Sequence, residues 1–358
     1  MTNQAALEQR IAMLRAGGSY RAYLAARAAV FAMLDHQPDE ARPSAYWTEE
    51  IAGFEYLFDA SPLIIEKLRQ HTYHITGLHD YEYRSHHNRS AEKFARRLAD
   101  VRAVDANGVF VPESRALGGF GFSVDGKLIN FDTLKFYEGL VVLDREGYLA
   151  PFRDGGARRT VVEIGSGWGG FAYQFKTLFP RTTYVLVDLP ASLLFAATYL
   201  ISLFPHARIK FVDGAPGSAV ISDASSYDFI FVPHYAWRDL VVGTPDMAVN
   251  FASFQEMTTG QVDGYIAGLH RINCPVLYSM NRDHSPNNDE LTTVRSIIKN
   301  YYRVAYDALA GAGHFPSENS RGGWKRRVKK LVSSRLRSAD GGGARDYRHV
   351  IAKLSSRA

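Results

Sequence analysis

The spacing of hydrophobic positions changes about halfway along the chain. In roughly the first hundred residues the spacing is mostly helical, and helices are expected over residues 5–34 and 64–68. Residues 108–130 alternate between apolar and polar side chains and contain turns, which predicts a short β-rich segment. A helix over residues 131–147 would then lead into the second half of the chain.

From about residue 157, short apolar runs alternate with helical segments, which is typical of βαβ units. Strands are predicted at residues 160–164, 183–187, 209–212, 229–232, 247–251 and 276–280. Helices are predicted at residues 169–178, 191–204 and 262–272. The helix over 191–204 is the longest apolar stretch, but it is short for a membrane span and carries polar side chains. It is therefore expected in the protein core.

A length of 358 residues, with 46% hydrophobic and 22% charged residues, is typical of a soluble globular protein with two domains. We expect a mainly helical N-terminal region with a short β-rich segment (residues 1–130), an α/β domain (131–317) and a C-terminal tail (318–358). The sequence contains one cysteine, Cys274, so no disulfide forms within the chain and no Cys/His zinc site is expected. Because no secretory signal is visible, a cytoplasmic location is expected.

The net charge of +5 is unevenly distributed. From Arg321 onward the chain has twelve Lys and Arg residues against two Asp, whereas the remainder has thirty basic and thirty-five acidic residues. The acidic body argues against nucleic acid as a partner. The basic tail is either a solvated segment or a weak contact for an anionic membrane surface or an acidic glycan.

A glycine-rich turn follows the first strand of the α/β domain, in the run VVEIGSGWGG. Glycines let the backbone turn tightly and approach a ligand, and the next helix presents unpaired N–H groups. The spacing Gly165-x-Gly167-x-x-Gly170 also fits a dinucleotide-binding turn, so alone it does not separate a methyltransferase from a dehydrogenase. Glu163 favours a methyltransferase, in which an acidic residue at this strand position faces the amino-acid end of the cofactor.

The next predicted strand ends at Asp188. An acid at this place can accept hydrogen bonds from both ribose hydroxyls of an adenosine, which argues against a nucleotide that carries a 2′-phosphate. Alternatively, Asp188 caps the helix that follows Pro190. Ser166 and Leu189, which stand beside these residues, are also expected to contact the cofactor.

Four segments in this order, VVEIGSGWGG, YVLVDLPASLL, VNFASFQEM and LYSMNR, resemble the sugar O-methyltransferase family of bacterial surface-polysaccharide and glycoside pathways. The resemblance covers about residues 131–282. It implies a Rossmann-like class I methyltransferase domain that binds S-adenosyl-L-methionine. In that case Glu163, Gly165, Gly167 and Gly169 would line the cofactor, and Asp188 would hold its ribose.

Two strands are predicted between Asp188 and Asp246, which is one more than this family needs. The third strand of the sheet is either residues 209–212 or residues 229–232. In the first placement Asp213 would lie near the adenine. In the second placement His234 and Tyr235 would lie there.

Two residues are candidates for the general base that a sugar hydroxyl needs, because it must lose its proton during methyl transfer. His234 follows a strand and titrates in a suitable range, and Glu256 lies just beyond the strand at 247–251. Both could instead be structural. Asn250, Ser253 and Gln255 are expected to bind the hydroxyl groups of the acceptor, with capping of the strand end as the alternative. No metal is expected, although Asp246, Glu256 and Asp283 keep a metal site open.

The sequence is also compatible with functions other than methyl transfer to a sugar or glycoside. The acceptor could be another small molecule or a lipid-linked compound. A NAD-dependent oxidoreductase would leave Glu163 unexplained, and a non-catalytic binding module would bind the cofactor without turnover. The Tyr- and His-rich residues 71–87 could line the acceptor pocket, because aromatic rings stack on sugar faces, or could be scattered between surface and core.

Overall fold

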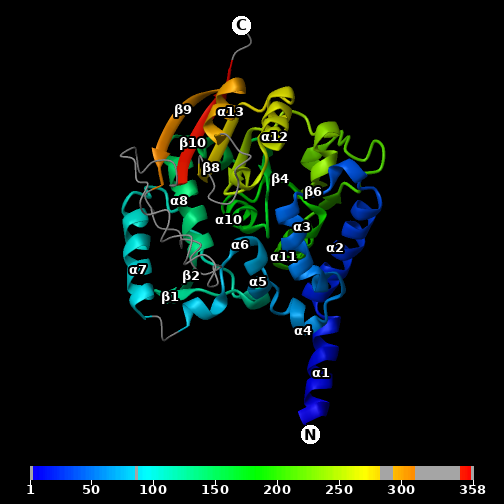
Figure 1. Cartoon of the computed structure of the whole chain (residues 1–358). Coiled ribbons are helices and arrows are strands. Elements are labelled where there is room, and N and C mark those ends of the chain that lie inside the picture. Colours follow the sequence, from blue (N-terminus) through cyan, green and yellow to red (C-terminus); the bar gives the residue numbers. More distant parts are fainter. Residues whose placement is uncertain (1–2, 85–87, 283–292, 311–346, 356–358) are drawn as a thin grey trace, which may run out of the picture.

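An eight-stranded sheet forms the centre of the protein, with the strand order β5-β6-β4-β3-β7-β8-β10-β9 (Figure 1). The computed structural model describes residues 3–84, 88–282, 293–310 and 347–355. The strands of the sheet are β3 (Arg159–Ile164), β4 (Thr182–Asp188), β5 (Ile209–Phe211), β6 (Phe229–Pro233), β7 (Met247–Phe251), β8 (Val276–Arg282), β9 (Tyr302–Leu309) and β10 (Tyr347–Leu354).

The strand order reverses at β3, which pairs in parallel with β4 on one side and with β7 on the other. The carboxyl ends of neighbouring parallel strands therefore meet at this point, where open α/β sheets bind their ligands. Beyond β8 the sheet ends in two antiparallel pairings, with β10 between β8 and β9. This topology confirms the predicted α/β, Rossmann-like fold.

Side chains on the two faces of the sheet pack into two hydrophobic cores. In β4, Tyr184 and Leu186 belong to one core, whereas Val185 and Val187 belong to the other, as the alternation along a strand requires. The first core includes residues of α8 (Phe131–Arg145), α10 (Gly170–Leu178) and α11 (Pro190–Leu203). The second includes residues of α12 (Thr259–Arg271) and α13 (Val294–Tyr301). Because both faces are covered, the central strands are mostly hydrophobic.

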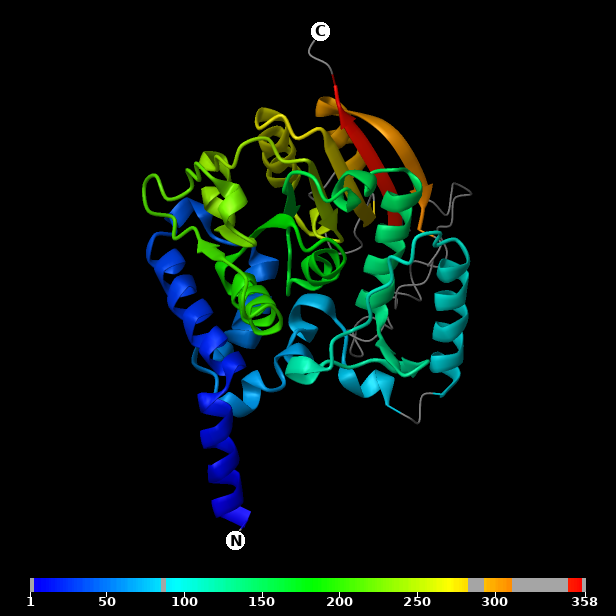
Figure 2. The same cartoon turned by 180° about the vertical axis from the view of Figure 1, so that it is seen from behind.

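The N-terminal helices pack on the first face, and Figures 1 and 2 show α2 beside α11 from both sides. Tyr23, Val30 and Phe54 share the first core with Phe195 of α11. The remaining elements are α1 (Asn3–Ala16), α2 (Gly18–Asp35), α3 (Ala45–Phe54), α4 (Pro62–Ile65), α5 (Leu68–His71), α6 (Tyr73–Thr76), α7 (Asn88–Ala103), α9 (Ala150–Arg153), β1 (Phe122–Val124) and β2 (Lys127–Ile129). Short 3-10 helices are η1 (Asp39–Ala41), η2 (Glu55–Asp59), η3 (Asp80–Tyr83), η5 (Ala116–Gly118), η6 (Ala224–Ser226), η7 (His234–Asp239) and η8 (Phe254–Glu256).

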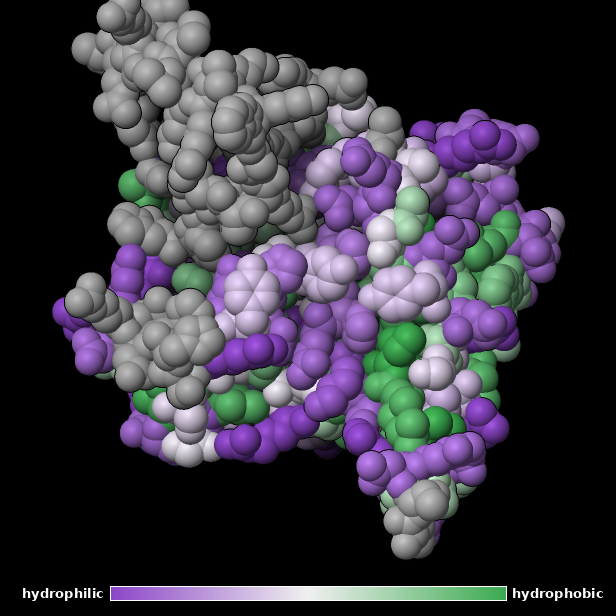
Figure 3. All heavy atoms as spheres, turned by 60° about the horizontal axis from the view of Figure 1, so that its bottom comes forward, coloured by the Kyte–Doolittle hydropathy of each residue, from purple (hydrophilic) through white to green (hydrophobic). Residues whose placement is uncertain are grey.

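Helix α1 projects from the body of the protein (Figures 1 and 2). Leu7 and Met13 on this helix are 47% and 66% exposed. Figure 3 shows that hydrophobic side chains gather beside the projecting end, on a face that is otherwise mostly hydrophilic. Within the described residues, no helix is long and apolar enough to cross a bilayer.

A buried charge cluster joins the N-terminal region to the α/β domain. The guanidinium of Arg69 on α5 is fully buried and pairs with Glu113 and Asp132, each at 2.9 Å. The guanidinium carbon also lies 3.7 Å from the centre of the Trp168 ring, and the Trp168 indole N–H donates to Asp132 at 3.1 Å. Since Trp168 belongs to the glycine-rich turn, this cluster fixes the turn to the N-terminal region.

All six predicted strands of the α/β domain are present, within two residues at each end. The third strand is β6, because it lies next to β4, and β5 is an additional strand at the edge of the sheet. The predicted helix over 5–34 is divided at Gly17 into α1 and α2, and that over 64–68 is divided into α4 and α5.

The C-terminal boundary needs a correction. We expected a tail over residues 318–358, but Tyr347–Leu354 forms β10, which lies inside the sheet and contributes the buried Val350, Ile351 and Ala352 to the cores. The prediction was wrong here because the apolar run VIA is short and follows a long basic stretch. The rest of the expected tail lies mostly outside the described residues.

Candidate active site

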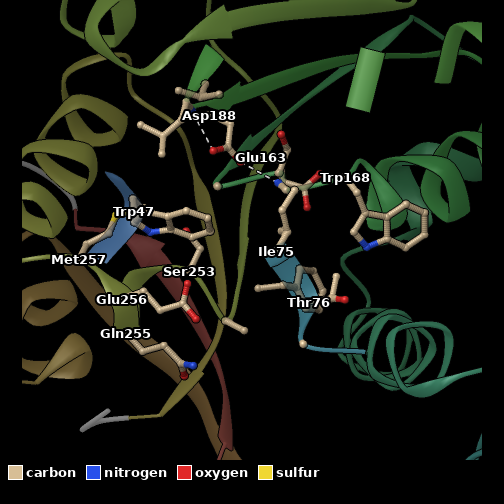
Figure 4. Close-up of a pocket in the computed structure, with 18 of the residues that line it drawn as sticks. Trp47, Ile75, Thr76, Glu163, Trp168, Asp188, Ser253, Gln255, Glu256 and Met257 are labelled. Atoms are coloured by element: carbon tan, nitrogen blue, oxygen red, sulfur yellow. Dashed lines mark hydrogen bonds between the residues drawn. The ribbon is translucent and has the colours of Figure 1, made fainter. Parts of the chain in front are cut away.

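A cavity of about 240 Å³ opens at the carboxyl ends of β3, β4, β6, β7 and β8. Figure 4 shows Glu163 and Asp188 on one side of this cavity and Ser253, Gln255 and Glu256 on another, with Trp47 between them in this view. Residues of the N-terminal region complete the wall, namely Arg42, Pro43, Ser44, Tyr46, Trp47 and Ile75–Leu78.

The glycine-rich turn brings its backbone close to the end of β7. Gly165 and Gly167 have φ angles of 70° and 54°, a region that side chains disfavour. A Cβ atom on Gly165 would lie 1.8 Å from Oγ of Ser253, so only glycine fits between the two strands. Gly169 instead caps α10 and packs against Ala196 and Leu200 of α11, and it is not among the residues that line the cavity.

Ser166 lines the cavity at this turn, and its side chain is buried. Among the described residues, none forms a hydrogen bond with its Oγ atom. Because a buried hydroxyl without a partner is unfavourable, this atom is suited to bind a polar group of a ligand.

Glu163 lies on β3 at the cavity and is 2% exposed. The Tyr184 hydroxyl donates a hydrogen bond to its Oε2 atom at 3.0 Å. Burial raises the pKa of Glu163 well above its usual value, and the nearby Asp188 raises it further, whereas Tyr184 and Lys135 lower it. A cationic ligand group beside Glu163 would favour its ionised form and lower its pKa again.

Asp188 at the end of β4 is held by two backbone amides. The N–H of Gly167 donates to Oδ2 at 2.6 Å, and the N–H of Leu189 donates to Oδ1 at 2.7 Å. Burial raises the pKa of Asp188 to about 6, although both hydrogen bonds lower it. The carboxylate has a fixed orientation at the cavity, and Leu189 lines the cavity beside it.

His234 follows β6, on the Asp188 side of the cavity, because Pro233 is the strand partner of Asp188. Its Nε2 atom lies 2.7 Å from the carbonyl oxygen of Ala41, which can only accept, so Nε2 carries the proton. Burial lowers the pKa of His234, and its buried Nδ1 atom has no hydrogen-bond partner among the described residues.

The structure places Tyr235 and Asp213 elsewhere, because neither is among the residues that line the cavity. The Tyr235 hydroxyl donates to the carbonyl oxygens of Met33 at 2.5 Å and of Asp213 at 3.3 Å. The Asp213 carboxylate accepts from the N–H of Ala215. We therefore leave these two residues out of the cofactor site that is proposed below.

The end of β7 supplies the opposite wall of the cavity. Ala252 has a φ of 57°, an uncommon conformation for a residue with a side chain, and such strain is often found at functional sites. Beyond this bend, Ser253 and Glu256 line the cavity together with Met257.

Two of the residues expected to bind the acceptor are already engaged within the protein. Asn250 is fully buried, donates to the carbonyl oxygen of Ile164 and accepts from Asn281, and it is not among the lining residues. Gln255 lines the cavity, but its Oε1 atom accepts from the N–H of Arg282 and its Nε2 atom donates to the Tyr347 hydroxyl. Both side chains thus position the chain at the ends of β7 and β8.

Trp47, Lys135 and Arg282 line the cavity and are among the side chains that the sequence did not indicate. Trp47 and Lys135 belong to helices outside the βαβ pattern, and no motif marks them. Arg282 is the last residue of the segment LYSMNR, so its position at the end of a predicted strand was the available signal. Of the Tyr- and His-rich segment, Ile75–Leu78 line the cavity, whereas Tyr73, His79 and Tyr81 stack on one another.

The three acids that kept a metal site open do not come together in the described part of the chain. Asp246 lies at the opposite end of β7 from Glu256, where it pairs with Arg159 and accepts from the N–H of Thr160. Asp283 lies outside the described residues. Among the described residues, no group of three His, Cys, Asp or Glu side chains could hold a metal ion.

The sequence matches no protein-family model and no curated protein. Solved structures with a similar fold include Haemonchus contortus phosphoethanolamine N-methyltransferase 2 in complex with S-adenosyl-L-methionine, at 14% identity and a TM-score of 0.35 over 61% of this chain and 52% of that one. This chain thus spans about half the length of that protein. Magnesium protoporphyrin IX methyltransferase from Synechocystis, with bound S-adenosylhomocysteine, has 11% identity and a TM-score of 0.37 over 72% and 99% of the two chains. At such low similarity the likeness concerns the fold alone.

Proposed function

We propose that this protein is an S-adenosyl-L-methionine-dependent O-methyltransferase that methylates a hydroxyl group of a sugar or glycoside, in polysaccharide or glycolipid biosynthesis. The main observation behind the proposal is that a single cavity is lined by two walls of different chemistry. One wall is the glycine turn with Glu163 and Asp188, and the other is the polar end of β7 with Ser253 and Glu256. The first wall suits a cofactor with an ammonium group and a ribose, and the second suits a hydroxylated acceptor.

The cofactor wall offers one group for each polar part of S-adenosyl-L-methionine. Asp188 would accept hydrogen bonds from the ribose hydroxyls, and Glu163 would pair with the ammonium group. The unpartnered Oγ of Ser166 and the ammonium of Lys135 would hold the carboxylate, since Lys135 uses one donor on Asp132 and has further donors. The backbone at Gly165 allows the close approach that this arrangement needs.

When bound, the cofactor supplies a methyl group that is already activated on a sulfonium sulfur. The protein must therefore orient the acceptor oxygen and remove its proton. Glu256 on the acceptor wall would take this proton, Ser253 would hydrogen-bond the acceptor, and the Trp47 ring would stack on the sugar face and exclude water.

His234 fits the cofactor side better than the acceptor side. Three strand spacings separate β6 from β7, and neighbouring strands lie about 4.8 Å apart, which places the two strand ends roughly 14 Å from each other. His234 and Glu256 therefore would not act on the same proton. We assign Glu256 as the general base and His234 to the nucleoside end of the cofactor.

Calorimetric titration with S-adenosylhomocysteine, with NADH in parallel, tests the cofactor. Binding of S-adenosylhomocysteine alone supports the proposal, whereas binding of NADH alone would overturn it in favour of an oxidoreductase. Mass spectrometry of a panel of glycosides, lipid-linked compounds and other small molecules, incubated with the protein and S-adenosyl-L-methionine, then tests the acceptor. If only lipid-linked or non-sugar acceptors gain the mass of one methyl group, the protein is a methyltransferase but its acceptor is not a sugar.

A further inference from the structure

Arg282 is the last residue of β8, and its side chain lines the cavity. It belongs to the acceptor half of the cavity, which is the half that contains Ser253 and Glu256. Its guanidinium carbon lies 4.6 Å from the centre of the Tyr347 ring on the neighbouring strand β10. Gln255 connects the two residues, because its Oε1 accepts from the backbone N–H of Arg282 at 2.9 Å and its Nε2 donates to the Tyr347 hydroxyl at 3.1 Å. The position of Arg282 is thus set by a ring and an amide, neither of which neutralises its charge.

This cation differs from the other two in the lining of the cavity. Lys135 pairs with Asp132 at 3.0 Å, and Arg42 pairs with Asp39 at 2.7 Å. In the part of the chain that the structure describes, Arg282 forms no ion pair, and its buried Nε atom has no hydrogen-bond acceptor. A buried charged donor without an acceptor is unfavourable, and an anion in the cavity would relieve that cost.

We infer that the acceptor carries an oxyanion, a carboxylate or a phosphate, which Arg282 binds through its planar fork of N–H groups. This inference rests on the proposed function, because it concerns the acceptor half of the same cavity. Guanidinium groups match carboxylate and phosphate oxygens with two parallel hydrogen bonds, and a ring against the guanidinium face keeps its edge directed at the ligand.

The carboxylate of Glu256 on the same wall determines how such an acceptor would lie. Like charges repel, so the oxyanion is held at Arg282 and kept away from Glu256. The hydroxyl group to be methylated then faces Glu256, which would remove its proton. An acidic or phosphorylated sugar meets both requirements, whereas a neutral sugar leaves Arg282 without a partner.

The test is calorimetric titration of the protein saturated with S-adenosylhomocysteine. The probes are methyl glucoside, methyl glucuronide, glucose 6-phosphate and inorganic phosphate, which tests the anion site without a sugar. We expect at least one anionic probe to bind about 10- to 100-fold more tightly than methyl glucoside, as charge-assisted hydrogen bonds allow. The comparison of glucuronide with sugar phosphate distinguishes the two sources of the oxyanion.

Three variants test whether Arg282 causes the preference for anionic probes. Arg282→Gln should remove this preference without changing the affinity for S-adenosylhomocysteine, and Arg282→Lys should keep part of it. Arg42→Gln removes the same charge from the same cavity, but Arg42 is already paired, so the preference should persist. Anionic probes that bind no better than methyl glucoside, or equally well to Arg282→Gln, overturn the inference. If the wild-type protein does not bind S-adenosylhomocysteine, the proposed function itself fails.

Discussion

At the scale of single residues, Asp188 combines a fixed orientation with a raised pKa. In the proposed cofactor site its ionised form would accept hydrogen bonds from the ribose, and its pKa of about 6 places its protonation just below neutral pH. The affinity for S-adenosylhomocysteine should therefore fall as the pH is lowered through 6, by about tenfold at pH 5 relative to pH 7. Calorimetric titrations across this range measure the effect.

The variants Asp188→Ala and Asp188→Asn provide the control for this pH dependence. Asp188→Ala should abolish cofactor binding, and Asp188→Asn should bind weakly and lose most of the dependence between pH 5 and 7. Wild-type affinity in Asp188→Ala would refute the ribose assignment. An unchanged pH dependence in Asp188→Asn would assign the titrating group to Glu163, whose pKa is also raised by burial.

Glu256 should affect turnover and not cofactor binding. Replacement by glutamine keeps the shape of the side chain but removes the base, and general bases contribute about 100- to 10,000-fold to rates. We expect Glu256→Gln to lower kcat within this range while its affinity for S-adenosylhomocysteine remains that of the wild type. The measurement is methyl transfer to an acceptor found in the glycoside panel. Normal turnover in this variant would mean that another residue is the base.

His234 should show the opposite behaviour, because it lies on the Asp188 side of the cavity. Its imidazole is neutral, since burial lowers its pKa, and it donates to the carbonyl oxygen of Ala41. We expect His234→Ala to weaken the binding of S-adenosylhomocysteine by several-fold, the loss expected for one hydrogen bond. Unchanged cofactor affinity together with a strongly reduced kcat would restore His234 as a candidate base.

At the scale of elements, the Arg69 cluster ties α5, α8 and the glycine turn together. Arg69→Met would leave Glu113 buried without its cation and Asp132 paired only with Lys135, which costs about 3–5 kcal/mol. We expect that loss in the free energy of unfolding, measured with urea. Cofactor affinity should also fall, because Trp168 of the turn loses the guanidinium on which it packs.

Arg84→Met is the matched control for this cluster. Arg84 pairs with Asp80 at 3.3 Å, but its side chain is 61% exposed. Exposed pairs contribute at most about 1 kcal/mol, so the stability of Arg84→Met should be close to that of the wild type. Equal losses of stability in both variants would show that burial of the Arg69 cluster has no special effect.

The parallel half of the sheet could be predicted because its strands are buried on both faces. Such strands are short, mostly apolar runs between turns, and β3, β4 and β6 all have this form. The glycine turn and Asp188 could be predicted for the same reason, since they stand at the ends of these runs. Strand β9 was missed because its exposed positions alternate with half-buried ones, so no apolar run marks it.

The walls of the cavity could be predicted only in part. Trp47, Lys135 and Arg282 reach the cavity through tertiary packing of segments that lie far apart in the sequence. Asn250 and Gln255 carry amide groups that suit the hydroxyls of a sugar, but their neighbours in the fold already use those amides. Local sequence shows which polar groups stand at a strand end, but not which of them are already bonded.

At the scale of the whole molecule, the C-terminal strand should be indispensable. β10 pairs with β8 and with β9, so among the described strands β9 joins the sheet only through β10. A protein that ends at residue 346 should therefore fail to fold, because β8 would expose its edge and the cores would lose Val350 and Ile351. Circular dichroism melting, beside a control that lacks only residues 356–358, measures this. A cooperative transition and binding of S-adenosylhomocysteine by the protein that ends at residue 346 would show that the first seven strands of the sheet fold independently.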